Sequence, residues 1–294
     1  MKKYRSEKIG KNIIRTYDEL LKLWDTDIKE IDLISSYGTT HVITCTDESK
    51  PPLVLFHGVG DDSALMWIYN AKFLSEHFSI YAVDTIGGPG KSVPGELYNK
   101  EFKDEDWIDS ILDDLGLEKA YFVGVSHGGN LVQRYAALRS DRVIKGIAIS
   151  SILSVGSGGK SSSMAAMMKV FMPEAIFPTP KNVEKLIKKL SGSNFTAFTE
   201  NSTIMEHYSY LLKGFNNMAM AYHKVRQFSE SEADIICNKV EFLIGLEDPF
   251  YKLSEKVDFK SSLMKATYYE NAGHGLNHEK AREINEKILE ILSK

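Results

Sequence analysis

The sequence of 294 residues has little cysteine, no excess of basic charge and no long apolar run. Cys45 and Cys237 lie far apart without Cys-x-x-Cys or Cys/His spacing, which predicts buried thiols in a reducing compartment and argues against a disulfide or metal site. The formal net charge of −4 provides no field that attracts nucleic acid or an anionic membrane surface. No apolar stretch approaches the roughly 20 residues of a membrane helix, and charged residues follow Met1 where a signal peptide would be apolar. These absences favour a cytoplasmic protein without a nucleic-acid or membrane partner.

The apolar residues that are present, 43% of the chain, are arranged as short strands alternating with amphipathic helices. Strands are expected at 52–56, 79–83, 121–123, 143–150, 240–245 and 266–269, and helices at 65–74, 107–115, 131–138 and 281–291. This alternation predicts an α/β fold with a doubly wound, mostly parallel sheet and right-handed crossovers. A helix over 12–24 and an edge hairpin over 28–46 come before it. In such sheets, ligands bind at the carboxyl ends of the strands.

The alternation stops after a Gly/Ser-rich stretch, 154–163, and the chain up to residue 239 is predominantly helical in pattern. Helices are expected at 164–172, 183–190 and 203–220. We therefore predict a core over 1–154, a helical cap or lid over 155–239, and the rest of the core over 240–294. Seven of the ten methionines lie in the cap, with Phe171, Phe177, Phe195 and Tyr208. They could line an adaptable apolar pocket or only pack the cap itself, and the sequence leaves both open.

The segment Gly124-Val125-Ser126-His127-Gly128 follows a buried strand and precedes a helix. A Gly-x-Ser-x-Gly sequence in that setting is typical of a nucleophile elbow, in which the serine lies on a sharp strand-to-helix turn. The flanking glycines suit the close approach of backbone segments at such a turn. Ser126 is therefore the candidate nucleophile.

A serine hydroxyl needs a histidine base, which is itself oriented by a carboxylate. His274 follows the last strand on a glycine-flanked loop and is the candidate base. Asp248 follows the strand at 240–245 and is favoured as the acid over its neighbour Glu247. The residues after the 143–150 strand contain no competing carboxylate, and the order Ser, acid, His is the one expected for an elbow nucleophile.

Two backbone N–H groups are candidates for the oxyanion hole, those of Val59 in the loop after the 52–56 strand and of His127 after the nucleophile. His57 is expected to shape that loop and Asp84 to anchor a turn. The glycine clusters complete no nucleotide-binding motif, since Thr85 stands where a phosphate-binding loop requires glycine. We expect no cofactor and no metal.

With these motifs, residues 37–294 resemble the α/β-hydrolase superfamily, of the capped kind that includes small esterases, perhydrolases and C–C hydrolases. The resemblance implies Ser126 as nucleophile, Asp248 as acid and His274 as base, with Val59 and His127 giving the oxyanion hole. Haloalkane dehalogenases and epoxide hydrolases of this superfamily carry an aspartate where this chain has Ser126. The turn at 84–92 is one residue longer than the common Asp-x-x-Gly-x-Gly-x-Ser form.

The resemblance implies a serine hydrolase, with a carboxylesterase acting on small or medium acyl esters through an acyl-enzyme intermediate as the favoured function. Its partner would be a small-molecule ester or a related acyl compound. A C–C bond hydrolase or perhydrolase with the same triad remains open. So does a ligand-sensing signalling protein that turns its ligand over slowly.

Overall fold

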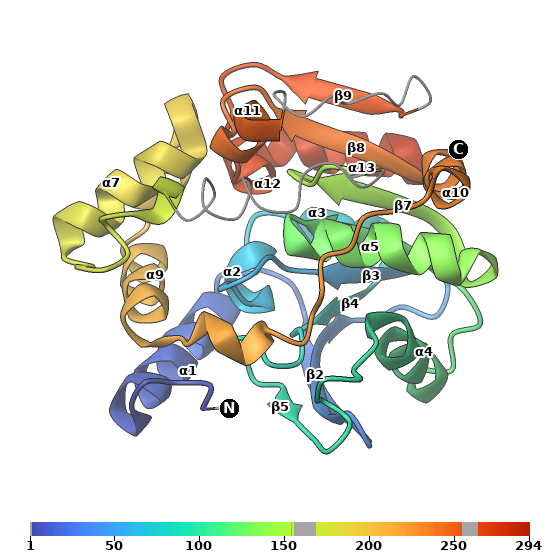
Figure 1. Cartoon of the computed structure of the whole chain (residues 1–294), viewed down its shortest axis with the longest axis horizontal. Helices are drawn as coiled ribbons and strands as arrows, with labels where there is room; N and C mark the ends of the chain where they lie inside the picture. Colours follow the sequence, from blue (N-terminus) through green and yellow to red (C-terminus); the bar gives the residue numbers. More distant parts are fainter. Residues whose placement is uncertain (1, 154, 156–168, 255–263) are drawn as a thin grey trace.

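The structure is a computed structural model that describes residues 2–153, 155, 169–254 and 264–294 (Figure 1). Most of the Gly/Ser-rich stretch at 154–163 and the first part of the helix expected at 164–172 lie outside the described residues. So do the cap methionines Met164, Met167 and Met168.

A nine-stranded sheet runs through the middle of the molecule in the order β1-β2-β4-β3-β6-β7-β8-β9, with the short β5 paired to β2. From β4 to β9 each neighbouring pair along this order is parallel, whereas β2 pairs antiparallel with β1, β4 and β5. This arrangement confirms the expected doubly wound, mostly parallel sheet with a hairpin at one edge. The strands are β1 Lys29–Ser35, β2 Gly38–Cys45, β3 Pro52–Phe56, β4 Ser79–Val83, β5 Val93–Pro94, β6 Ala120–Val125, β7 Val143–Ile149, β8 Val240–Gly245 and β9 Ala266–Tyr269.

Helices cover both faces of the sheet, because the central strands are apolar on both sides and must be shielded twice. On one face α3 and α13 pack against side chains such as Leu55 and Val123, and on the other α4, α5 and α10 pack against Val54 and Phe122 (Figure 1). The helices are α1 Glu7–Leu21, α2 Ser63–Met66, α3 Ala71–His77, α4 Asp104–Asp114, α5 His127–Leu138, α7 Pro180–Ser191, α8 Thr196–Thr199, α9 Ser202–Gly214, α10 Glu230–Lys239, α11 Pro249–Ser254, α12 Leu276–Glu279 and α13 Ala281–Leu292. None of the helices in the described ranges is long and apolar enough to cross a membrane.

Two helices near the N-terminus differ from their expected bounds. The first begins at Glu7, five residues early, because the Ser6 hydroxyl caps it by accepting the N–H of Ile9 at 3.3 Å. The helix expected at 65–74 is divided into α2 and α3. Between them Asn70 is buried and donates to the side chain of Asn285 at 2.7 Å, a tertiary contact that sequence periodicity does not register.

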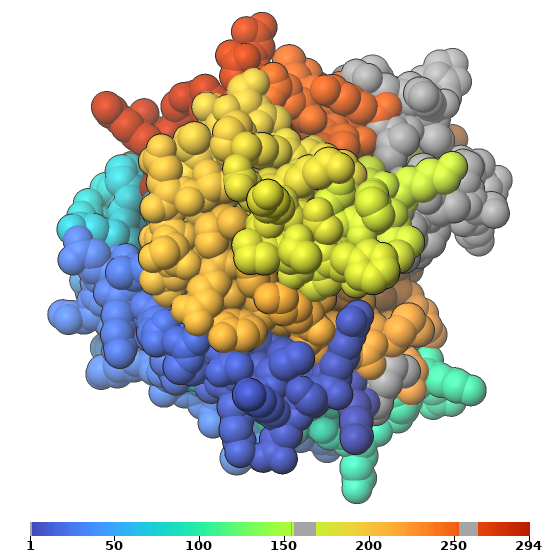
Figure 2. Space-filling model, turned by 90° about the vertical axis from the view of Figure 1, so that its left-hand side faces the viewer, coloured from blue at the N-terminus to red at the C-terminus, as the bar shows by residue number. Residues whose placement is uncertain are grey.

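The helices α7 to α9 lie beyond the carboxyl ends of the strands, as expected for a cap, and α9 packs on α1 (Figures 1 and 2). The helix α10 also falls within the range 155–239, but it packs against α5, β7 and β8 (Figure 1). It therefore lies with the helices that cover the sheet. The division of the chain into core and cap remains a prediction.

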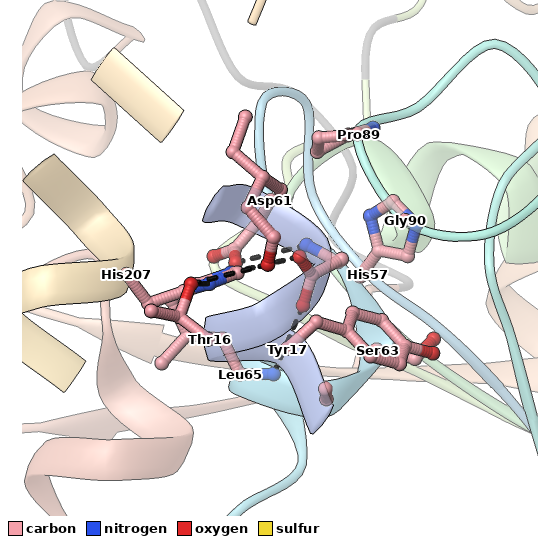
Figure 3. A network of polar contacts seen from close by, with 12 residues as sticks. Thr16, Tyr17, His57, Asp61, Ser63, Leu65, Pro89, Gly90 and His207 are labelled. Carbon is pink, nitrogen blue, oxygen red and sulfur yellow. Dashed lines mark hydrogen bonds and ion pairs between the residues drawn. The ribbon is translucent and has the colours of Figure 1, made fainter. Parts of the chain in front are cut away.

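A buried polar chain fastens α9 to the rest of the molecule. His207 of α9 is fully buried, its Nδ1 lies 2.7 Å from the hydroxyl of Thr16 in α1, and its Nε2 lies 2.8 Å from Asp62 Oδ2 (Figure 3). Asp62 also caps α2 by accepting the N–H of Leu65 at 3.1 Å. Burial works to raise the pKa of Asp62, but the His207 imidazole and the hydrogen bonds outweigh it and hold that pKa below its ordinary value.

The substitution His207→Ala is expected to lower the free energy of unfolding by about 3 to 5 kcal/mol, because it leaves the buried Asp62 carboxylate without its partner. Urea denaturation followed by circular dichroism measures this. The matched control Lys213→Ala, at an exposed position of the same helix, should change stability by less than about 0.5 kcal/mol. If His207→Ala lowers the free energy of unfolding no more than Lys213→Ala does, the buried chain does not stabilise the fold as proposed.

Candidate active site

Ser126 lies on a strained turn between β6 and α5. Its φ of 56° and ψ of −114° place a non-glycine residue in a region that costs conformational energy, and such strain gathers at functional sites. A Cβ at Gly124 would overlap the Gly128 carbonyl, and one at Gly128 would overlap the Phe56 carbonyl. The two glycines therefore allow the tight turn that the sequence predicted for a nucleophile elbow.

Asp248 and His274 meet through a hydrogen bond. Asp248 follows β8 and is 2% exposed, and its Oδ2 accepts a hydrogen bond from His274 Nδ1, which follows β9, at 2.8 Å. Its other oxygen accepts the N–H of Phe250 at 2.8 Å, which fixes the carboxylate plane. Because Nδ1 carries the shared proton, the neutral ring keeps Nε2 free to act as a base. The ring of Phe250 packs edge-on against the imidazole, with 4.7 Å between centroids.

Glu247, the alternative candidate for the acid, is hydrogen-bonded to a different residue. Its Oε2 accepts the backbone N–H of Ser193 at 2.6 Å, and both of its oxygens lie 2.9 Å from the Ser193 hydroxyl. Ser193 follows α7 in the cap region. The structure thus pairs His274 with Asp248 and ties Glu247 to the cap.

The segments that carry the candidate oxyanion donors lie beside Ser126. Val59 belongs to the loop between β3 and α2, and a Cβ at its neighbour Gly58 would lie 3.4 Å from the Cβ of Ser126. His127 is the first residue of α5, where the helix presents unpaired N–H groups and the positive end of its dipole. Burial lowers the pKa of the His127 side chain to about 3, so its ring is neutral at physiological pH. The backbone N–H of His127 is therefore the group that we consider for the oxyanion hole.

His57 and Asp84 hold loops, as expected. The buried His57 ring lies between the Gly58 carbonyl, 2.8 Å from Nδ1, and the Thr85 N–H, which donates to Nε2 at 2.9 Å. The Asp84 carboxylate accepts the N–H of Ser63 and the hydroxyl of Tyr17, each at 3.0 Å (Figure 3). Through these hydrogen bonds the two side chains hold the loop after β3 and the turn after β4 in place.

Among the apolar residues named for the cap, Phe171 packs near the catalytic loops, since its ring is 5.7 Å from that of Phe250. Phe177 is 67% exposed and Met218 is 60% exposed, so neither lines an enclosed pocket. Met220 is buried in a small apolar cluster with Phe215 and Ala219, which fits the alternative of internal packing. In the described parts of the chain, no group of three or more His, Cys, Asp or Glu side chains could hold a metal ion.

Glu279 is a buried carboxyl that the sequence analysis did not single out. It lies five residues after His274, and its Oε2 accepts the N–H of Gly273 at 2.7 Å. Burial raises the pKa of Glu279 to about 8, and the charges of Asp248 and Glu247 add to that effect. No sequence signal distinguishes this glutamate from the exposed glutamates nearby, because its burial depends on how the loop folds over α12.

The comparisons with known proteins agree with this fold. A family model described as the alpha/beta hydrolase fold matches residues 51–256. Carboxylesterase YbfK of Bacillus subtilis strain 168 is 25% identical over 296 residues, covering 96% of this chain and 94% of that protein. The uncharacterized carboxylesterase nap of the same strain is 26% identical, covering 97% of this chain and 93% of that protein. The crystal structure of naproxen esterase from Bacillus subtilis aligns with a TM-score of 0.78 at 23% identity, over 98% of this chain and 99% of that one.

The raised pKa of Glu279 predicts a pH-dependent effect on stability. Its ordinary value is 4.5 and its folded value about 8, so the native state keeps a proton that the unfolded chain releases. Stability therefore falls as pH rises from about 4.5 towards 8. Glutamine does not titrate, so Glu279→Gln does not lose stability over this pH range. It should be more stable than the wild type by up to about 3 kcal/mol at pH 7, and the two proteins should be equally stable near pH 4.

Denaturant unfolding at both pH values measures this difference. Glu283→Gln, at an exposed position near the start of α13, provides the control for loss of a glutamate charge. If Glu279→Gln raises the free energy of unfolding by the same amount at pH 4 and pH 7, titration of this carboxyl is not the cause.

Proposed function

This chain belongs to the α/β-hydrolase fold family, and from that premise we propose that it is a serine hydrolase that cleaves small or medium acyl carboxylic esters through an acyl-enzyme. The observation that carries the proposal is the Asp248–His274 hydrogen bond at the same edge of the sheet as the strained Ser126. Similarity to two carboxylesterases over nearly the whole chain supports the ester as the substrate class.

In the first half of the proposed reaction, Ser126 Oγ attacks the ester carbonyl carbon while His274 Nε2 takes the hydroxyl proton. Asp248 stabilises the imidazolium that forms and keeps its ring in place. The N–H groups of Val59 and His127 stabilise the carbonyl oxygen as it gains negative charge. The bond to the alcohol then breaks, and Nε2 returns the proton to the departing oxygen.

In the second half, a water molecule attacks the acyl carbon and gives a proton to His274 Nε2. The ester bond to Ser126 breaks, Nε2 returns that proton to Oγ, and the carboxylic acid leaves. Apart from the substrate and water, each step uses only side-chain and backbone groups of this chain, so the proposed reaction requires no cofactor. The buried thiols of Cys45 and Cys237 fit the cytoplasmic location that we propose.

The substitution Ser126→Ala is expected to lower kcat/KM for p-nitrophenyl butyrate by about 10³-fold or more, because no other group can form the acyl-enzyme. Steady-state kinetics measures this, with equal melting temperatures showing that the variant folds. Ser110→Ala, at a half-buried serine of α4, is the matched control and should keep wild-type activity.

Turnover by Ser126→Ala within tenfold of the wild type would overturn the assignment of the nucleophile. Wild-type turnover of a vinylogous diketone that is faster than turnover of any ester would instead make this chain a C–C bond hydrolase with the same triad.

A further inference from the structure

The turn that ends α7 contacts both catalytic loops. We call residues 190–194 the cap turn, residues 246–248 the acid loop and residues 271–275 the base loop. In the base loop, His274 donates its backbone N–H to the Leu190 carbonyl at 2.7 Å, and the Asn271 carbonyl accepts from the Asn194 side chain at 2.6 Å. The backbone of the candidate base is thus hydrogen-bonded to the cap region.

Glu247 lies where all three segments meet. Its backbone N–H donates to the Ala272 carbonyl at 2.8 Å, which joins the acid loop to the base loop. Its carboxylate accepts from the Ser193 N–H at 2.6 Å and from the Ser193 hydroxyl at 2.9 Å, which joins the acid loop to the cap turn. Hydrogen bonds to an ionised carboxylate are among the stronger ones in proteins, so this is the main polar tie between the acid loop and the cap turn.

The backbone of the cap turn is shaped for this contact. Gly192 has a φ of 58°, a left-handed conformation that glycine adopts without steric cost. A Cβ at this position would overlap the Glu247 carboxylate. A side chain in place of Gly192 would therefore both strain the turn and displace the group that it binds.

We propose that Glu247 is a positioning residue: its carboxylate fastens the cap turn to the acid loop, and the cap turn in turn holds the backbone of His274 through the Leu190 carbonyl. The inference rests on the proposed function, in which His274 is the base. It means that the α7 end of the cap is a fixed support of the catalytic loops. The place of the imidazole then depends on docking of the cap as well as on Asp248.

The test compares Glu247→Ala, Glu247→Gln and the wild type on p-nitrophenyl butyrate. Glu247→Ala removes both hydrogen bonds to Ser193 and should lower kcat about tenfold or more with KM changed less than twofold, since small misplacement of a catalytic group is costly. Glu247→Gln keeps an acceptor oxygen and should restore most of the lost kcat. The matched control Glu270→Gln, an exposed glutamate next to the base loop, should leave kcat unchanged.

Hydrogen exchange supplies a readout that does not need turnover. In Glu247→Ala the amide of His274, which is bonded to Leu190, should exchange faster, while amides of β6 keep their protection. Wild-type kcat in Glu247→Ala, or unchanged exchange at His274, would overturn the inference. Either result leaves the proposed function standing, since that function is tested separately, by the activity of Ser126→Ala and by the comparison of esters with a diketone.

Discussion

The hydrogen bond between Asp248 and His274 is the interaction on which the rest of the site depends. It joins the loops after β8 and β9, two neighbouring parallel strands, so the sheet itself brings the partners together. The carboxylate is buried and is held by the Phe250 N–H as well, which leaves it one orientation. Around this pair, the strained turn at Ser126 presents the candidate nucleophile at the same edge of the sheet.

Two sets of polar contacts, one at α9 and one at α7, differ in their chemistry. At α9 the tie is a fully buried Asp62–His207–Thr16 chain that also reaches α1 and the start of α2. At α7 the contacts are made by the Glu247 carboxylate and by the backbone carbonyls of Leu190 and Asn271, and they join the end of α7 to the loops that carry Asp248 and His274. The first attachment contributes mainly to stability, because breaking it leaves an unpaired buried charge. The second affects the proposed reaction, because one of its hydrogen bonds is donated by the backbone N–H of His274.

The sequence predicted the sheet well because local pattern decides it, and the triad of Ser126, Asp248 and His274 stays a prediction. Ser126, Asp248 and His274 were expected in the segments that follow apolar strands, and the structure pairs His274 with Asp248. The strands β4, β8 and β9 have the expected bounds. Where long-range contacts matter, the sequence was insufficient: the buried Asn70, bonded to Asn285, lies between the two parts of an expected helix, and α10 packs with the sheet. The early start of α1 depends instead on a local contact, the Ser6 cap. The hydrogen bonds between Glu247 and Ser193 link segments far apart in the chain, and no local pattern predicts them. No local pattern predicts the burial of Glu279 either, although its partner Gly273 lies only six residues away.

The central claim is that Ser126, His274 and the oxyanion donors act on one acyl group. A crystal structure of the wild-type protein after reaction with a p-nitrophenyl alkylphosphonate tests this most directly, because the adduct resembles the tetrahedral intermediate. We expect phosphorus bonded to Ser126 Oγ, with the phosphonyl oxygen within hydrogen-bonding distance of the Val59 and His127 N–H groups and His274 Nε2 facing Oγ. An adduct on another residue, or an oxygen turned away from both N–H groups, would contradict it.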